Sequence, residues 1–130
     1  MAGYSSTPLP QKLGIKDGSK VAVLGGPRGF SDSLGAATRL GKTLLDVIIV
    51  FVTKKADLAD RIAAARKVMQ PAAGLWIAWP KKSSKLETDI TENVVRDIAL
   101  ANALVDNKVA AITEIWSGLQ LVIRVKDRLP

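Results

Sequence analysis

The stretch K-V-A-V-L-G-G-P-R-G-F, residues 20–30, decides the fold class of this chain. It begins with a short apolar run at residues 21–24, which is typical of a buried strand. The run ends abruptly at a turn rich in glycine, residues 25–29, and we expect a helix to begin at Ser31. Strand, tight turn and helix in this order predict the opening unit of a parallel α/β sheet.

The alternation of strand and helix continues along the chain. Residues 45–53 and 74–79 are unbroken apolar runs, which favours strands covered by helices on both faces. Helices are predicted at residues 31–40, 57–70 and 88–104, and a closing pair of strands at residues 108–113 and 119–125. We therefore predict an α/β fold, a three-layer Rossmann-like sandwich with a mostly parallel sheet and a C-terminal antiparallel hairpin.

Length and composition predict a single domain spanning residues 1–130. The chain has 130 residues, 48% of them hydrophobic, which is enough to bury a core. Residues 1–19 are expected to form an N-terminal extension with one helical turn at residues 7–14, and residues 20–125 the sheet and its helices. We see no signal peptide, and the longest apolar run is too short to span a bilayer, so we expect a cytoplasmic protein.

The absence of two residue types narrows the chemistry. The sequence contains no cysteine and no histidine, which removes thiolate nucleophiles, cysteine metal sites and the commonest general base. We predict no metal site and assign no catalytic residue. The composition favours a non-enzymatic binding or interaction protein over an enzyme.

The order of elements over residues 20–125 resembles a shortened class I S-adenosylmethionine-dependent methyltransferase domain. Asp46, at the start of an apolar strand, matches the fourth strand of that fold. The run Q-P-A-A-G-L-W at residues 70–76 is similar to the entry to its fifth strand, and W-S-G at residues 116–118 resembles its terminal antiparallel pair. The resemblance implies an S-adenosylmethionine site at the glycine turn, with Gly25, Gly26, Arg28 and Gly29 as candidate cofactor-binding residues.

The glycine turn departs from the methyltransferase pattern, acidic-x-G-x-G-x-G. Val23 stands at the acidic position and Pro27 at the middle glycine, where its ring meets the approaching ligand and no N–H is present. The second strand, whose acidic residue binds ribose hydroxyls in that family, is short or absent. The turn also fits neither G-x-G-x-x-G nor the P-loop pattern. A tight turn that needs glycine explains it without a cofactor.

A second resemblance covers nearly the whole chain. The chain resembles a small bacterial family of unknown function. The stretches that together carry this resemblance are residues 4–9, 12–16, 79–82, 88–92 and 116–119. This resemblance implies a soluble bacterial protein and carries over no activity.

Basic residues follow three successive predicted strands. They are Arg28, Lys54, Lys55, Lys81 and Lys82. The carboxyl ends of parallel strands meet at one edge of a sheet, where ligands bind in open α/β folds. We therefore predict an electropositive rim there, which an anionic small molecule or a nucleic-acid backbone would suit. The alternative is a solvated surface that Asp57 partly neutralises.

Two further pairs of residues admit a functional and a structural interpretation. Trp79 and Trp116 are either stacking surfaces for bases or packing residues. Asp89 and Glu92 are either an acid–base pair or a capping box.

The net charge of +7 permits weak nucleic-acid binding. The leading hypothesis is thus an anion-recognising or protein-binding module, with a divergent methyltransferase and a weak nucleic-acid binder as alternatives. If the final strand lies at an open edge of the sheet, it can also pair with the same strand of a second copy of the chain.

Overall fold

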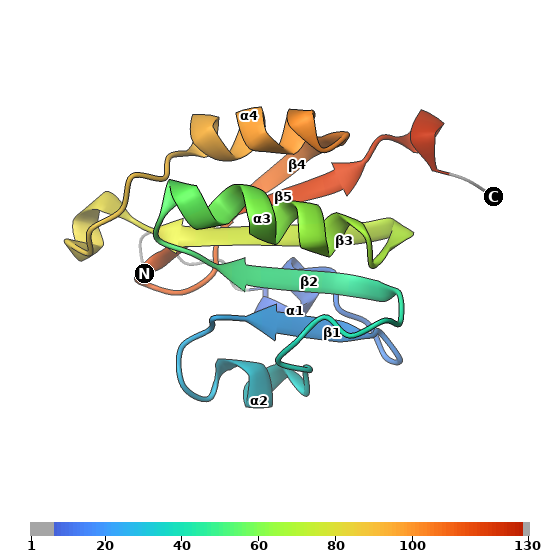
Figure 1. The fold of residues 1–130 in the computed structure, drawn as a ribbon. Coiled ribbons are helices and arrows are strands. Elements are labelled where there is room, and N and C mark those ends of the chain that lie inside the picture. The colour runs from blue at the N-terminus through green and yellow to red at the C-terminus, as the bar shows by residue number, and fades with distance from the viewer. Residues whose placement is uncertain (1–6, 129–130) are drawn as a thin grey trace.

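The computed structural model describes residues 7–128, which form one five-stranded sheet with helices on both faces (Figure 1). The strand order is β1-β2-β3-β5-β4. The strands are β1 (Val21–Leu24), β2 (Leu45–Phe51), β3 (Met69–Pro80), β4 (Leu104–Ala111) and β5 (Trp116–Ile123). β1, β2 and β3 run parallel, and β5 runs antiparallel to both β3 and β4. The predicted α/β class, with parallel strands first and an antiparallel hairpin last, is confirmed.

Helices cover the two faces unequally (Figure 1). They are α1 (Leu9–Lys12), α2 (Phe30–Leu34), α3 (Lys55–Arg66) and α4 (Glu92–Ala101), with short 3-10 turns η1 (Lys82–Ser84) and η2 (Val125–Asp127). The longer helices α3 and α4 pack on one face, and the short α1 and α2 lie toward the other. No helix within residues 7–128 is both long and apolar enough to cross a membrane.

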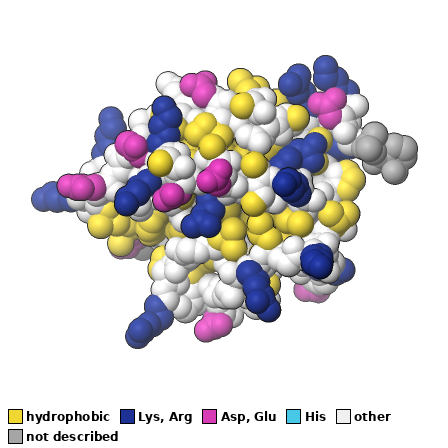
Figure 2. Space-filling view, in the orientation of Figure 1, with side chains coloured by type: hydrophobic (Ala, Val, Ile, Leu, Met, Phe, Trp, Pro, Cys, Tyr) yellow, Lys and Arg dark blue, Asp and Glu magenta, His cyan; other side chains and the backbone are white. Residues whose placement is uncertain are grey.

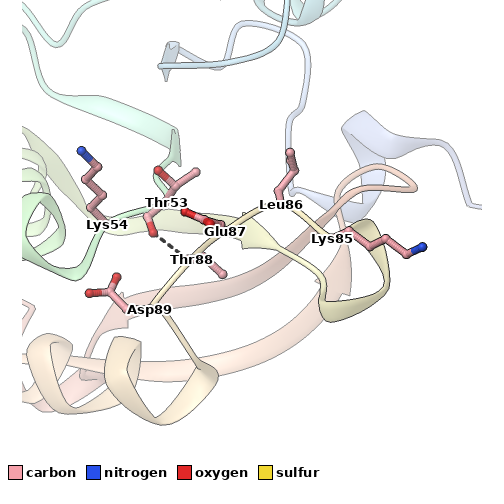
Figure 3. A pocket seen from close by; sticks show the side chains of 7 residues that line it. All are labelled: Thr53, Lys54, Lys85, Leu86, Glu87, Thr88 and Asp89. Carbon is pink, nitrogen blue, oxygen red and sulfur yellow. Dashed lines mark hydrogen bonds between the residues drawn. The ribbon is translucent and has the colours of Figure 1, made fainter.

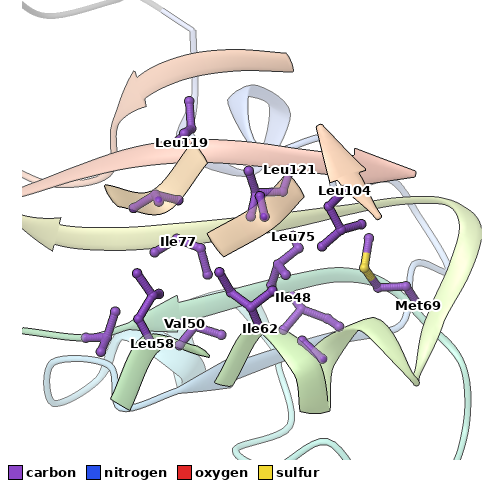
Figure 4. Close-up of a cluster of buried hydrophobic side chains, with 14 of the residues drawn as sticks. Ile48, Val50, Leu58, Ile62, Met69, Leu75, Ile77, Leu104, Leu119 and Leu121 are labelled. Carbon is purple, nitrogen blue, oxygen red and sulfur yellow. The ribbon is translucent and has the colours of Figure 1, made fainter. Parts of the chain in front are cut away.

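The larger core lies between the sheet and the helices α3 and α4 (Figure 4). Ile48 and Val50 of β2 and Leu75 and Ile77 of β3 point toward this face, where Ile62 of α3 meets them. All five side chains are fully buried. The second core uses the intervening strand residues, such as Ile49 and Trp76, which explains why the central strands do not alternate.

The segment before β1 completes the second core. Leu13 is fully buried, and its carbonyl oxygen accepts a hydrogen bond of 3.2 Å from the indole Nε1 of Trp76. Leu9 and Ile15 pack beside it. Residues 9–15 of the predicted extension therefore supply part of the layer that covers β1, β2 and β3, and residues 1–6 lie outside the described residues.

Two predicted helices are shorter in the structure. The helix expected at residues 31–40 is α2, which ends at Gly35 in a left-handed conformation with φ +61°. Ala37 then pairs with Ala22 of β1, so the chain after Gly35 runs along the sheet edge. The helix expected to reach residue 70 ends with α3 at Arg66, because residues from Met69 onward already pair with β2.

The C-terminal half differs from the prediction in three ways. The helix expected at residues 88–104 is the shorter α4, which Thr91 caps by accepting a hydrogen bond from the N–H of Val94. The final strand β5 lies inside the sheet, and β4 is the edge strand. Both strands of the hairpin begin earlier than predicted, at Leu104 rather than residue 108 and at Trp116 rather than residue 119. A bulge between Asp106 and Lys108 interrupts the β4 edge, and bulges and charges at edges oppose pairing with a second copy.

The role of Leu13 can be measured. Replacing Leu13 with Ala removes a fully buried side chain, and we expect the free energy of unfolding to fall by about 2–5 kcal/mol. Urea denaturation followed by tryptophan fluorescence measures this loss. Leu44→Ala is the matched control, because Leu44 is 41% exposed and its truncation should cost less than about 1 kcal/mol. Equal effects of the two substitutions would contradict the packing of the N-terminal segment.

Candidate functional site

The topology gathers four loops at one edge of the sheet. The parallel strands β1, β2 and β3 end there, and β4 ends there too because it is antiparallel to β5. The loops that follow them are residues 25–29, 52–54, 81–91 and 112–115. We call this region the carboxyl edge. It is where open α/β sheets bind ligands, so all the predicted site residues are located relative to it.

The glycine turn packs directly on the end of β2. A methyl group on Gly25, whose φ is +68°, would lie 2.9 Å from the backbone oxygen of Phe51. A methyl group on Gly26 would lie 2.9 Å from Val23 Cγ1 and 3.4 Å from the Phe51 ring. Both glycines are therefore required by the close approach of this turn to the neighbouring strand. Gly29, with φ +82°, has nothing within 4 Å of such a methyl group.

Phe51 also organises an aromatic cluster beside the turn. Its ring makes edge-to-face contacts with Phe30 at 4.9 Å and with Trp116 at 5.1 Å between centroids. Phe30 and Phe51 are buried, whereas Trp116 is half-buried. Trp79, the other proposed stacking residue, is only 8% exposed and belongs to the core under α3 and α4. Its role as an open stacking surface is thus wrong.

The second strand of the methyltransferase pattern is reduced to one bridge. The N–H of Val23 donates to the carbonyl of Ala37 at 2.8 Å, and the N–H of Ala37 donates to Val21 at 2.9 Å. No acidic residue occurs between Asp32 and Asp46. The position expected to bind ribose hydroxyls therefore has no carboxylate.

The five predicted rim cations lie at the carboxyl edge. Arg28 belongs to the glycine turn, Lys54 and Lys55 come between β2 and α3, and Lys81 and Lys82 follow β3. All are exposed except Lys81, which is half-buried. The ion pairs within residues 7–128 use only Arg96 and Arg124 as cations. Lys85 extends the basic run beyond η1, and no strand end marks it in the sequence, because it lies within the loop 81–91.

Basic side chains are not confined to this edge. Figure 2 shows lysines and arginines projecting at both ends of the molecule, with acidic side chains interspersed among them. What distinguishes the carboxyl edge is therefore the combination of cations with the glycine turn and Trp116, rather than charge alone.

An open hollow of about 720 Å³ lies beside residues 85–89 (Figure 3). Thr53, Lys54 and the loop side chains from Lys85 to Asp89 line it. Lys54 and Lys85 extend away from one another (Figure 3), so the hollow does not focus two ammonium groups on one point. Glu87 and Asp89 add negative charge.

Two hydrogen bonds fasten the loop 81–91 to the start of α3. Thr88 Oγ1 donates to the carbonyl of Thr53 at 2.6 Å, and the N–H of Lys55 donates to Asp89 Oδ1 at 2.7 Å. Asp89 therefore places its carboxylate at the N-terminus of α3, where the helix dipole favours negative charge. The predicted capping box of Asp89 and Glu92 is wrong: Thr91 caps α4, whereas Asp89 accepts from the first N–H of α3.

Glu92 is separated in function from Asp89. It forms an ion pair with Arg96, whose guanidinium also bonds to Asp106 of β4 at 3.1 Å. The hydrogen bond to Asp106, followed by that to Glu92, raises the pKa of Arg96 above its ordinary value. Asp89 and Glu92 therefore serve two different contacts. Within residues 7–128, no three acidic side chains come together as a metal site would require.

Comparison with solved structures places the chain among methyltransferase-like folds. A protein assigned to the type 11 methyltransferases from Sulfolobus solfataricus superposes with a TM-score of 0.64 at 13% identity, covering 94% of this chain and 93% of that one. An S-adenosylmethionine-dependent methyltransferase from Aquifex aeolicus gives 0.59 at 17% identity, covering 87% of each chain. Fibrillarin from Aeropyrum pernix, solved with S-adenosylmethionine, gives 0.56 at 14% identity, covering 88% of this chain and 73% of that one.

These similarities establish the fold alone, because the sequence identities are low. No protein-family profile matches the chain, and no curated protein matches it in sequence. The shared feature is a methyltransferase-like sheet with parallel strands first and an antiparallel hairpin at the end.

The two outer glycines of the turn should respond differently to substitution. Gly25→Ala places a methyl group against a backbone oxygen that cannot move easily, so we expect a loss of about 2–4 kcal/mol in unfolding free energy. Gly29→Ala meets open space and should cost only about 1–2 kcal/mol for its positive φ. Paired chemical denaturation curves measure both. A smaller loss for Gly25 than for Gly29 would contradict the packing on Phe51.

The contact between Asp89 and α3 gives a second structural test. Asp89→Ala leaves the N–H of Lys55 without its acceptor and should lower the unfolding free energy by about 1 kcal/mol. Asp57→Ala, in the first turn of the same helix, is the control and should cost about half as much because it removes only a dipole interaction. Thermal unfolding of both variants measures the difference. A loss of stability confined to the Asp57 variant would contradict the contact between Asp89 and the N-terminus of α3.

Proposed function

We propose that this protein is a non-enzymatic binding module that recognises an anionic ligand at the carboxyl edge. The observation that supports the proposal is the placement of Arg28, Lys54 and Lys81 after three adjacent parallel strands, free of ion pairs within residues 7–128. Unpaired cations beside exposed backbone favour phosphate or carboxylate groups. Lys55 and Lys82 extend the same surface.

The geometry of the glycine turn argues against the family cofactor. Gly25 and Gly26 are accounted for by their contacts with Phe51. Val23 supplies no carboxylate for the methionine moiety, and the Ala37 bridge brings no acidic residue to the ribose position. We therefore propose no resident cofactor and no catalytic residue.

A divergent methyltransferase is the second candidate. The comparisons favour it, because the chain superposes on nearly the full length of an S-adenosylmethionine-dependent enzyme. In that case Gly25, Gly26, Arg28 and Gly29 would line the cofactor site, with the backbone replacing the missing acidic contact.

Weak nucleic-acid association through the rim is a third hypothesis. A bacterial, cytoplasmic origin is part of the same proposal and follows from the resemblance and the sequence alone.

Thermal-shift titration separates these candidates. S-Adenosylmethionine, inorganic phosphate and common nucleotides are titrated in parallel against the full chain. A ligand at about a hundred times its dissociation constant stabilises the fold by ~2.7 kcal/mol, a shift of several degrees for a domain of this size. We expect saturable shifts with the phosphate-bearing ligands and none with S-adenosylmethionine.

Charge reversal then locates the site. The double variant Lys54→Glu, Lys81→Glu should abolish the anion-dependent shift. Lys42→Glu with Lys67→Glu, exposed lysines at the opposite end of the strands, is the matched control and should retain the shift. A shift with S-adenosylmethionine alone would replace the proposal by the methyltransferase. Equal losses in both double variants would show general charge attraction instead of a site.

A further inference from the structure

The β4–β5 hairpin has a surface, on the side of the sheet away from α3 and α4, that neither core covers. Leu121 and Ile123 lie in the core under α3 and α4, so Val122 between them points to the opposite face. Val105 of β4 is its cross-strand partner and points the same way. Both valines are half-buried and belong to neither core. We call this surface the hairpin face, and it comprises Gly74, Val105, Asn107, Lys108, Gln120 and Val122.

Gln120 is a polar side chain that is buried within the hairpin face. It is only 9% exposed and lies opposite Trp76 of β3. Its Oε1 accepts a hydrogen bond of 2.7 Å from Asn107 Nδ2, whereas its Nε2 has no acceptor within residues 7–128. No side-chain nitrogen or oxygen in that range is both buried and unpartnered, so Nε2 reaches the surface. Gln120 therefore presents a fixed N–H donor at this face.

Two features of the neighbouring strands hold the amide of Gln120 in place. A methyl group on Gly74 would lie 2.6 Å from Gln120 Nε2, so the amide fills the space that a side chain at residue 74 would need. The bulge in β4 lets two successive residues, Asn107 and Lys108, both face Gln120. Regular alternation forbids this arrangement, and bulges re-aim side chains in this way.

Lys108 brings a positive charge to the same place. It is the cross-strand partner of Gln120, and its Nζ lies 5.9 Å from the centre of the Trp76 ring, on the far side of β5. The side chain can reach that ring from β4 only by crossing over Gln120. Lys108 is exposed and forms no ion pair within residues 7–128. An ammonium group and a free amide N–H therefore lie over one small area of the sheet.

We propose that the hairpin face binds a small aliphatic carboxylate. Its oxygens accept hydrogen bonds from Lys108 Nζ and Gln120 Nε2, two groups that can only donate. Its alkyl group contacts Val105 and Val122, which supply apolar surface beside the donors. Lys108 is the one charged residue of the hairpin face, and a single cation matches a monoanion better than a doubly charged phosphate. This site is separate from the carboxyl edge and does not depend on the function proposed there.

Titration of the ¹⁵N-labelled full chain with isovalerate tests the proposal at the atom concerned. The side-chain amide resonances of Gln120, identified by their loss in Gln120→Met, should shift to saturation. Isovaleramide, which has a similar shape and no charge, should bind about tenfold more weakly because the ionic hydrogen bond from Lys108 is lost. Acetate should also bind more weakly, because it buries less apolar surface. Equal affinity for the acid and its amide, or tighter binding of inorganic phosphate, would overturn the inference.

Variants of Lys108 separate binding from packing. Lys108→Met keeps a long apolar chain beside Trp76 but removes the charge, and it should abolish isovalerate binding, whereas Lys108→Arg should retain it. Lys42→Gln is the matched control, because Lys42 is an exposed lysine outside the hairpin face, and it should bind as the wild type does. If Lys108 serves only to cover Trp76, Lys108→Met will bind isovalerate with unchanged affinity, and the proposal is wrong.

Gly74→Ala tests the position of the Gln120 amide with little risk to the fold. The atoms nearest to the added methyl group are the end of the flexible Gln120 side chain, so the amide moves and the strands stay in place. Affinity for isovalerate should fall about tenfold, while thermal unfolding shows that the variant remains folded. A folded Gly74→Ala variant that binds isovalerate as tightly as the wild type would remove Gln120 from the site.

Discussion

The carboxyl edge depends on the packing around Phe51 at the end of β2. Its backbone oxygen and ring determine how closely Gly25 and Gly26 approach, and its ring supports Phe30 and Trp116 at 4.9 and 5.1 Å. A single apolar residue therefore couples the glycine turn to the β4–β5 hairpin. Because interiors are close-packed, the shape of this edge is fixed by the second core and leaves the turn little freedom to open.

The charges at this edge are arranged by topology more than by pairing. Asp89 satisfies the first N–H of α3 with the chain's own carboxylate, so the helix terminus that would attract an anion already has one. In the proposed function, recognition of an external anion therefore depends on the side chains of the rim. The hollow beside residues 85–89 contains lysines that diverge and two carboxylates (Figure 3), an arrangement that does not favour an anion.

Much of the fold was predictable because the apolar runs of β2 and β3 are long and lack alternation. The errors arose where tertiary contacts overrule local pattern. Gly35 ends α2 so that Ala37 can pair with β1, and Asp89 reaches across to Lys55 instead of capping the helix that follows it. The rim residues were predictable from strand ends alone. The difference between Trp79, which is buried, and Trp116, which is half-buried, was not, since it depends on which face of the sheet a helix covers.

The chemistry of the reduced second strand favours an anion over a neutral ribose. Hydroxyl groups are bound by carboxylates, which accept their hydrogen bonds, whereas a guanidinium or an ammonium can only donate. Between Asp32 and Asp46 the chain has no acidic residue, and Arg39 is the cation nearest in sequence to Ala37 of the bridge. Arg39 comes two residues after the bridge to β1, in the segment that follows the pairing of Ala37 with Ala22. The segment beside β1 therefore carries a donor and no carboxylate, which fits the proposed preference for a phosphate over a sugar hydroxyl.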